Sequence, residues 1–570
     1  MKQLYSIFLT ALLFAEAAAQ KPTHTEFLGR PGDRSITVQL FFDQDVDMQL
    51  RCGTQSGTYP VQSSWQTFAA GTPAEITLSG LDPDKQYYYR VAYRKPGTTN
   101  EILRPEYRFR TAAPAGKTFT FVVQADPHLD EQSDTGIYRL CLKNQLADNP
   151  DFMIDLGDIL MSDKLQNAAR QIPRDTVTYR AHLMRSYYET MSHSVPVFLT
   201  VGNHEGECGW LNSANGNNVA VWGTLDRKKY FVNPEPDAFY SGDTTNYKYV
   251  GRRESYYAWE WGDALFVILD PYWNTSPKPD SLNGWRWSLG KTQYDWLKST
   301  LERSNKKFKF VFAHQLVGGD PEGRGGVEFA SRYEWGGKNL DGTYGFDTKR
   351  PGWYKPIRDL LKENRATIFF HGHDHFFGKQ QESCLIYQEV PQPSHPNFSS
   401  AKQATDYGYV EGQILPNSGH LRVQVSPDGV KVDYVRVYLP RNETGSRKNR
   451  DVSASYYIGA KNCYDSLSTN VPILWNEAYA GELIYPNPFQ HRTELRFSVQ
   501  QDAPYQLFVT NQQGQKLRTL WANQLIRKGD YLMIWDGRND AGNELPAGVY
   551  YVHFVEGSNQ ARTQKVIINP

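Results

Sequence analysis

Short, mainly apolar runs recur through the middle of the chain, and polar clusters follow most of them. These runs cover residues 118–124, 151–156, 195–201, 264–269, 308–313 and 366–370. Their β-branched and aromatic residues predict buried strands. Residues 136–147, 165–191, 292–302 and 353–364 have the pattern of helices, the second with a break at Pro173. Strands that alternate with helices predict an α/β or layered domain, which we place at 117–475.

The first part of the chain has a pattern of strands and turns only. Residues 35–42 alternate between apolar and polar side chains, as a half-buried strand does. Residues 75–92 have the pattern strand, turn, strand, and we expect Leu81 to pack against Tyr87. The sequence therefore predicts a β-sandwich at 21–113.

The last part of the chain is again all-β. Residues 494–499 and 545–552 have strand-like sequences. We therefore expect a second β-sandwich at 481–570, so that the chain is multidomain with a β-sandwich at each end.

The N-terminus has the pattern of a signal peptide at 1–20. Lys2 is basic, 7–15 is apolar, and 17–19 are three alanines that fit a cleavage site. No later segment is long and apolar enough to span a bilayer, so we expect an exported, soluble mature chain without a transmembrane segment.

Composition excludes some partners. Lys+Arg and Asp+Glu both total 62, so no nucleic acid is expected as a bulk partner. The five cysteines lack a CxxC pair and metal-site spacing, so they are interpreted as structural, with at most two disulfides and one thiol left over.

Polar side chains follow five of the predicted strands. They are Asp126, His128, Asp158, Asn203, His204, His314, His373 and His375. Ligands bind at the carboxyl ends of strands in α/β folds, so we expect these groups to converge. Carboxylate, imidazole and amide groups suit Mn, Fe or Zn. There are too many ligands for one ion, and two ions about 3.5–4 Å apart need a bridge such as Asp158.

The ordered blocks Asp-x-His, Gly-Asp, Gly-Asn-His-Glu, His and Gly-His-x-His resemble the calcineurin-like metallophosphoesterase superfamily. The resemblance implies a central α/β/β/α sandwich and two divalent or trivalent transition-metal ions. It implies that one ion is held by Asp126, His128 and His375, the other by Asn203, His314 and His373, and that Asp158 lies between them. It also implies that Asn203 and His204 contact substrate, and that His204 is catalytic rather than a ligand.

The resemblance implies a secreted phosphoesterase that hydrolyses small phosphate esters by attack of a metal-bound hydroxide. No Gly-x-Ser-x-Gly or Gly-x4-Gly-Lys-Ser/Thr motif is present, which favours hydrolysis without a protein nucleophile. One alternative is a phosphodiesterase that acts on lipid head groups or cyclic nucleotides. An alternative of another class is a surface adhesin or glycan-binding protein with an inert phosphoesterase scaffold.

Residues 21–113 resemble the fibronectin type III-like domain at the front of purple acid phosphatases. Two positions depart from that family. Its members have glycine where His128 stands and a tyrosine ligand where Met161 stands. Without that tyrosinate we predict no purple Fe(III) colour.

Residues 481–570 resemble the C-terminal sorting domain of the type IX secretion system of Bacteroidota. The resemblance depends on Tyr-Pro-Asn-Pro-Phe at 485–489 and Gly-Val-Tyr-Tyr at 548–551. It implies that the type IX machinery exports the protein from the periplasm across the outer membrane, and that the chain is then released or attached at the cell surface. The alternative is an adhesive or carbohydrate-binding sandwich.

Two insertions, 207–255 and 315–352, follow strands that end in polar clusters. Loops of this length in a compact domain are often functional, so we expect them to form walls of a substrate pocket. Their candidate contacts to an anionic substrate are Arg324, Arg332, Lys338 and Arg350. Solvated loop charges are the alternative for each, and the oligomeric state is open.

Overall fold

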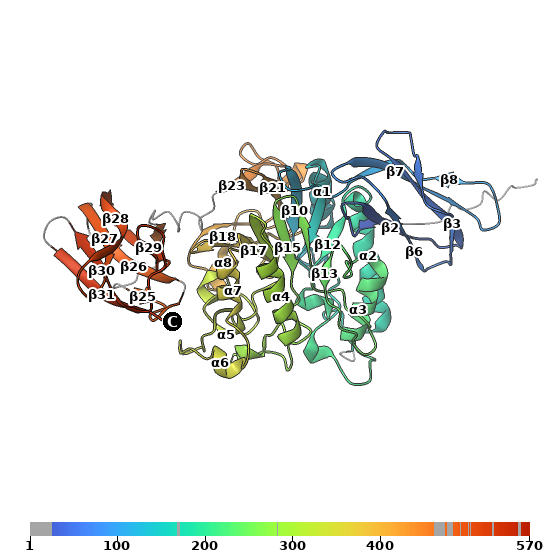
Figure 1. The fold of residues 1–570 in the computed structure, drawn as a ribbon. Coiled ribbons are helices and arrows are strands. Elements are labelled where there is room, and N and C mark those ends of the chain that lie inside the picture. Colours follow the sequence, from blue (N-terminus) through green and yellow to red (C-terminus); the bar gives the residue numbers. More distant parts are fainter. Residues whose placement is uncertain are drawn as a thin grey trace, which may run out of the picture.

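The computed structural model describes residues 25–569, with gaps at 168–170, 282, 461–472, 476–482, 491, 500, 502, 527–528 and 557–559. The predicted signal peptide lies outside the described residues. Figure 1 shows an N-terminal β body, a central body of sheets and helices, and a C-terminal β body. None of the helices in the described ranges is long and apolar enough to cross a membrane.

The central body is built on two sheets. The first has the order β12-β11-β10-β21-β22-β23, and the second has the order β13-β14-β15-β16-β17-β19-β18-β20. Strands β10, β11 and β12 are parallel to one another, as are β15, β16, β17 and β19. The first sheet comprises β10 (Phe119–Gln124), β11 (Phe152–Asp155), β12 (Val197–Leu199), β21 (Gly419–Ser426), β22 (Gly429–Arg436) and β23 (Val452–Gly459). The second comprises β13 (Ser241–Gly242), β14 (Tyr257–Trp261), β15 (Ala264–Ile268), β16 (Phe308–Phe312), β17 (Ile368–His371), β18 (Phe377–Glu382), β19 (Leu385–Glu389) and β20 (Gln413–Leu415).

Side-chain alternation along the strands divides the apolar residues of the central body into three cores, one between the sheets and one on the outer face of each sheet. Phe121 of β10 and Phe310 of β16 lie in one core shared by both sheets. Val122, the neighbour of Phe121, points to the opposite face and packs with Tyr138 and Met184 of two helices. Successive strand residues point to opposite faces, so strands covered on both sides become almost wholly apolar.

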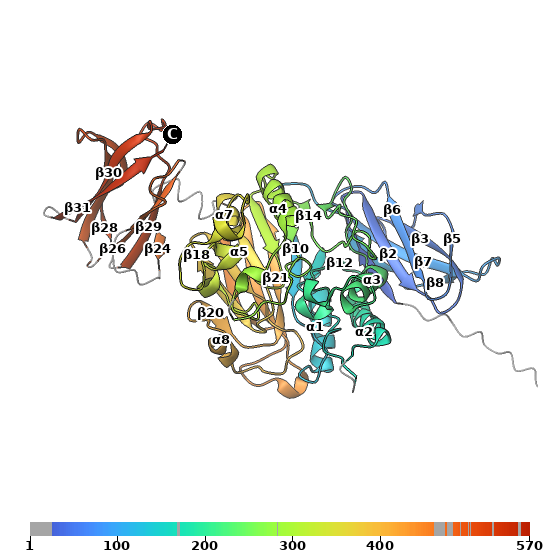
Figure 2. The ribbon, with the colours of Figure 1, turned by 90° about the horizontal axis from the view of Figure 1, so that it is seen from below.

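Helices cover the outer faces of both sheets. Figure 2 shows α1 and α2 on one side and α4 and α7 on the other. Leu297 of α4 and Leu360 of α7 share a core with Val311 of β16. The central body therefore has four layers, in the order helix, sheet, sheet, helix. Its helices are α1 (Thr135–Ala147), α2 (Arg174–Ser192), α3 (Val219–Tyr230), α4 (Lys291–Arg303), α5 (Tyr333–Gly336), α6 (Phe346–Lys349), α7 (Ile357–Glu363) and α8 (Lys402–Asp406).

Several helices differ from the sequence predictions, and α2 and α3 are the longest of them. The helix predicted at 165–191 begins only at Arg174, after Pro173, because proline favours an extended residue before it and suits a helix start. Helix α3, inside the first insertion, was not predicted. Its Gly223 and its charged residues hide the helical pattern. A Cβ at Gly223 would lie 2.6 Å from the carbonyl oxygen of Glu205.

Two antiparallel sheets form the N-terminal body and share one hydrophobic core. Leu81 and Tyr87 both belong to this core, and the Tyr87 hydroxyl accepts a hydrogen bond of 2.9 Å from the Asp82 amide. One sheet contains β1 (Glu26–Gly29), β2 (Ser35–Phe41) and β6 (Pro73–Ser79). The other contains β3 (Val46–Gly53), β4 (Val61–Gln62), β5 (Gln66–Phe68), β7 (Gln86–Arg94), β8 (Ile102–Leu103) and β9 (Tyr107–Arg110).

The C-terminal body also has two sheets around one core. One consists of β24 (Ile473–Trp475), β25 (Leu483–Tyr485), β26 (Thr493–Val499) and β29 (Gly529–Trp535). The other consists of β27 (Ala503–Thr510), β28 (Lys516–Ile526), β30 (Gly548–Glu556) and β31 (Gln560–Ile568).

Buried polar contacts join the N-terminal body to helix α2. The buried guanidinium of Arg185 donates to Gln39 Oε1 at 2.7 Å, and Tyr89 donates to the carbonyl of His193 at 2.7 Å. Four of the five cysteines lie within the described residues. Cys52, Cys141 and Cys208 are buried free thiols, so more than the one predicted thiol remains unpaired, whereas Cys384 is disulfide-bonded.

Candidate metal centre

Loops after β10, β11 and β12 bring polar side chains to one end of the sandwich. Asp126 and His128 follow β10, Asp158 follows β11, and Asn203 and His204 follow β12. Asp126, His128 and Asp158 have φ values of 58°, 49° and 59°. This region costs a non-glycine residue of order 1–3 kcal/mol, and such conformations cluster at functional sites.

Strands β16 and β17 of the second sheet supply the remaining side chains. His314 follows β16, and His373 and His375 follow β17. The five strands therefore belong to two different sheets, whose loops meet. The meeting requires glycine at position 372, because a Cβ there would lie 2.6 Å from Asp126 Oδ2.

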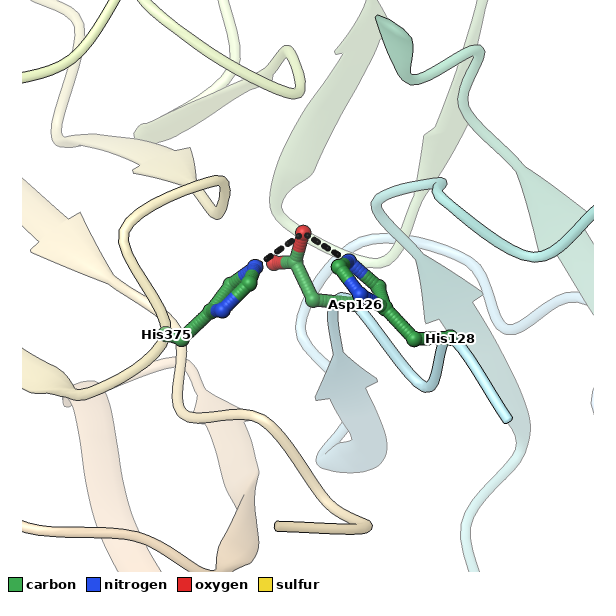
Figure 3. Close-up of side chains that lie close together, drawn as sticks. All are labelled: Asp126, His128 and His375. Atoms are coloured by element: carbon green, nitrogen blue, oxygen red, sulfur yellow. Dashed lines mark ion pairs between the residues drawn. The ribbon is translucent and has the colours of Figure 1, made fainter. Parts of the chain in front are cut away.

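Asp126, His128 and His375 form the first group, which Figure 3 shows in close-up. Both imidazoles point their Nε2 atoms at the same oxygen, Asp126 Oδ1, at 3.5 Å from His128 and 3.4 Å from His375. These three side chains come from two loops that are almost 250 residues apart in sequence. Each offers one ligand atom within 4.8 Å of the others, which is the arrangement of a metal site.

Asp158, His314 and His373 form the second group. The Nε2 atom of His314 lies 3.3 Å from Asp158 Oδ2 and 3.2 Å from Nδ1 of His373. Asn203 joins this group, because its Oδ1 lies 3.0 Å from the same Nε2 atom. The other nitrogen of His314, Nδ1, donates to the carbonyl of Leu156 at 2.9 Å, which leaves Nε2 directed into the group.

Asp158 lies between the two groups. Its Oδ2 atom is 3.4 Å from Nε2 of His128 in the first group and 3.3 Å from Nε2 of His314 in the second. The structure thus brings all seven predicted ligands together, with the predicted bridging carboxylate in the middle.

Three ligand atoms in this cluster have no hydrogen-bond partner among the described residues. They are Asp126 Oδ1, Asp158 Oδ2 and His128 Nε2, and all three are buried. A buried polar atom without a partner costs about 1–3 kcal/mol, and more when the group is charged. Coordination of cations would satisfy all three atoms at once, so this set of donors fits a metal centre.

The pKa shifts within the cluster also favour a metal centre. Burial would raise the pKa of Asp126, but His314 and His375 hold it well below its usual value. Burial would lower the pKa of His314, yet the carboxylates of Asp158 and Asp126 raise it to about 9. Two fully buried carboxylates therefore attract positive charge strongly, which metal cations can supply.

His204 stands beside the cluster, outside both groups. Its Nδ1 atom lies 2.7 Å from Asp163 Oδ1, and its Nε2 atom lies 3.9 Å from Asp158 Oδ2. Asp163 was missed in the sequence analysis, because it lies in a loop and follows no strand. The only signal was its position five residues after Asp158.

Glu205 was also missed, although it belongs to the Gly-Asn-His-Glu block. Its buried carboxylate accepts hydrogen bonds from the amides of Asp158 at 3.0 Å, Ile159 at 2.6 Å and Leu160 at 3.1 Å, and from that of Gly202. Glu205 therefore fixes the backbone that carries Asp158.

The four cationic residues predicted to meet an anionic substrate have other roles or positions. Arg350 pairs with buried Glu334 at 2.5 Å and donates to the carbonyl of Trp285 at 2.6 Å. Arg324 donates to the carbonyl of His373 at 2.7 Å. Arg332 stacks over Phe329, and Lys338 is an exposed side chain. The first two therefore hold the second insertion in place.

We predict that Glu205→Gln weakens metal binding by roughly 10–100-fold, the usual effect of losing a residue that supports a ligand. The amide NH2 would face backbone N–H groups where a carboxylate now accepts. Competition with a chelator measures the affinity, and circular dichroism checks the fold. Glu260→Gln, at an exposed position on β14, is the control. Unchanged metal affinity in Glu205→Gln would contradict this role.

Comparison with known proteins agrees with this geometry. Residues 119–377 match the model of the calcineurin-like phosphoesterase family, and residues 488–560 match that of the FlgD Ig-like domain. No curated protein matches the chain.

The solved structures that are similar to this chain include two for which the match covers the same share of it. The structure of PhoD is 16% identical, with a TM-score of 0.56, and the match covers 77% of this chain and 90% of that one. Purple acid phosphatase PPD1 from yellow lupin (Lupinus luteus) is 14% identical, with a TM-score of 0.49, and the match covers 77% and 74%. At such identities the likeness to PhoD shows a common fold. The family model adds a match to calcineurin-like phosphoesterases that is confined to residues 119–377.

Proposed function

We propose that this protein is a metal-dependent hydrolase of small phosphate esters with a dinuclear centre. The observation that carries the proposal is the meeting of two buried ligand groups at Asp158. The match of residues 119–377 to a phosphoesterase family supports the reaction class. The unpartnered ligand atoms argue against an inert scaffold, because a scaffold without metal would leave them unsatisfied.

In this proposal Asp126, His128 and His375 hold one ion, and Asn203, His314 and His373 hold the other, with Asp158 shared. Two transition-metal ions, Mn, Fe or Zn, would neutralise phosphate oxygens and lower the pKa of bound water toward about 7. The protein's own residues fix the ligand atoms: Asp126 Oδ2 accepts from the His373 amide at 2.8 Å, and Asp158 Oδ1 accepts from the His204 amide at 2.7 Å.

We assign His204 to proton transfer at the leaving-group oxygen. A carboxylate accepts hydrogen bonds, so Asp163 keeps a proton on Nδ1 and fixes the orientation of the ring. The Nε2 atom then points toward the cluster, 3.9 Å from Asp158 Oδ2. Because the ring is partly exposed, at 13% of its side-chain surface, a substrate can reach it. When the ring is the doubly protonated imidazolium, Nε2 can hold the phosphate and donate its proton to the departing oxygen, which leaves a neutral ring with its proton on Nδ1.

Purified protein loaded with Mn, Zn or Fe should hydrolyse p-nitrophenyl phosphate or its bis ester. The ratio of the two rates distinguishes a monoesterase from a diesterase, which includes the alternatives acting on lipid head groups or cyclic nucleotides. Asp158→Asn should lose bound metal and activity together, because it removes the charge shared by both groups. Elemental analysis follows the metal. No hydrolysis of either ester by fully metal-loaded protein would refute the proposal.

His204→Ala should keep its metal but lower kcat by roughly 10²–10⁴-fold, as expected for loss of a proton donor. The deficit should shrink for esters with acidic leaving groups, which need less protonation. Asp163→Asn should give a smaller loss, because the ring remains but its orientation is less fixed. A His204→Ala variant with the full rate would show that the assignment is wrong.

We also propose export to the cell surface or the medium through the type IX machinery. The pattern of residues 1–20 and the motifs at 485–489 and 548–551 support it. Mass spectrometry of the protein from its native host should find a chain that begins near Lys21 and lacks 481–570. Deletion of 481–570 should trap the protein in the periplasm. Normal export of the deletion variant would contradict this route.

A further inference from the structure

The second insertion reaches back to a candidate metal ligand. We propose that Arg324 is a positioning residue that holds His373 in its ligating orientation, so that the insertion 315–352 sets the metal affinity of the second group. This inference rests on the proposed metal centre and assigns the insertion a role in assembling it.

The insertion fixes the nitrogen that His373 presents. Nε2 of His373 lies 3.0 Å from the carbonyl oxygen of Glu322, inside the insertion. A carbonyl only accepts hydrogen bonds, so Nε2 carries the proton and Nδ1 keeps its lone pair. That Nδ1 atom lies 3.2 Å from Nε2 of His314, within the second group. Metal-binding histidines are commonly oriented in this way through their other nitrogen.

Arg324 connects the two partners of this contact. Its Nη1 donates to the His373 carbonyl at 2.7 Å, and its Nε donates to the Glu322 carboxylate at 3.3 Å. One rigid guanidinium therefore contacts both the ligand residue and the residue that orients its ring. The Arg324 side chain is 18% exposed, and its guanidinium carbon lies 4.3 Å from the centre of the Tyr407 ring.

The backbone of His373 needs this support. Its φ of 77° lies in the left-handed region, where a residue without special constraints is less stable by about 1–3 kcal/mol. Its amide donates to Asp126 Oδ2 at 2.8 Å, and its carbonyl accepts from Arg324. Removal of Arg324 would leave only one of these two hydrogen bonds to hold the backbone of His373.

Asp374, the residue after His373, also connects the ligand loop to the insertion. Its carboxylate accepts from Arg324 at 3.2 Å, from the Gly325 amide at 2.9 Å and from the Tyr409 hydroxyl at 2.7 Å. The segment around Tyr409 is in turn held by Glu328 of the insertion, which accepts from the Val410 amide at 2.8 Å. The insertion, the ligand loop and the 407–411 segment thus form one connected unit.

The test compares metal binding by apo-protein of Arg324→Met, Arg324→Lys and the wild type. Methionine keeps the aliphatic stem and removes every donor, and lysine keeps one donor. Titration with Zn²⁺ or Mn²⁺ in competition with a chelator should show two sites in the wild type. In Arg324→Met one site should weaken by roughly 10–100-fold, and in Arg324→Lys it should weaken less. Arg332→Met, in the same insertion, where the guanidinium stacks on Phe329, is the matched control.

Wild-type affinity at both sites in Arg324→Met would overturn the inference, as would an equal loss in Arg332→Met. If Arg324→Met does not fold, Arg324→Lys is the deciding variant. Wild-type metal affinity at both sites of Arg324→Lys then overturns the inference. The proposed function fails separately. A wild type that binds two ions and hydrolyses no ester refutes the function, while the effect of Arg324 on metal affinity can still be measured.

Discussion

The structure depends on two carboxylates, Asp126 and Asp158, that are buried side by side among imidazoles. Both are at most 1% exposed, and each has an oxygen without a hydrogen-bond partner among the described residues. Buried carboxylates are strongly unfavourable without compensation, so they persist only with positive charge nearby and a scaffold that holds them in place. The imidazoles supply part of the compensation. Metal binding at the same atoms, as proposed above, would supply the rest.

The two-sheet core provides that scaffold. Parallel strands from both sheets end at the same place, and their loops are too short to let the carboxylates separate. Three ligand residues on the first sheet adopt positive φ values, and a glycine at position 372 lets the second sheet's loop approach Asp126. The strands that carry these loops are held by the aromatic core between the sheets, where Phe121 packs against Phe266 and Phe310. Ligand geometry is therefore set by core packing far from the solvent.

Sequence alone could select the candidate ligands that the structure brings together, because each follows a strand, and strands with two covered faces are conspicuous apolar runs. His314 and His373 were found in this way. The supporting residues could not be found, because their partners are distant in sequence and their own surroundings are featureless. Asp163 lies in a loop, and Glu205 acts on amides more than forty residues earlier. Arg324 and Arg350 were grouped with substrate contacts because a sequence shows charge but not the buried carboxylate, Asp374 or Glu334, that pairs with it.

The site therefore contains two sets of residues, the candidate ligands that follow strands and the residues that support them from elsewhere in the chain. The ligands are tied to strands, so any chain with this fold can present them at the same place. Arg324 comes from a long insertion, and its guanidinium reaches a ligand's carbonyl rather than solvent. An insertion that contributes such a contact cannot vary freely, because its conformation is coupled to the metal affinity. The same coupling works in reverse: a substrate that shifts the insertion would also change how firmly His373 is held, since linked equilibria are reciprocal.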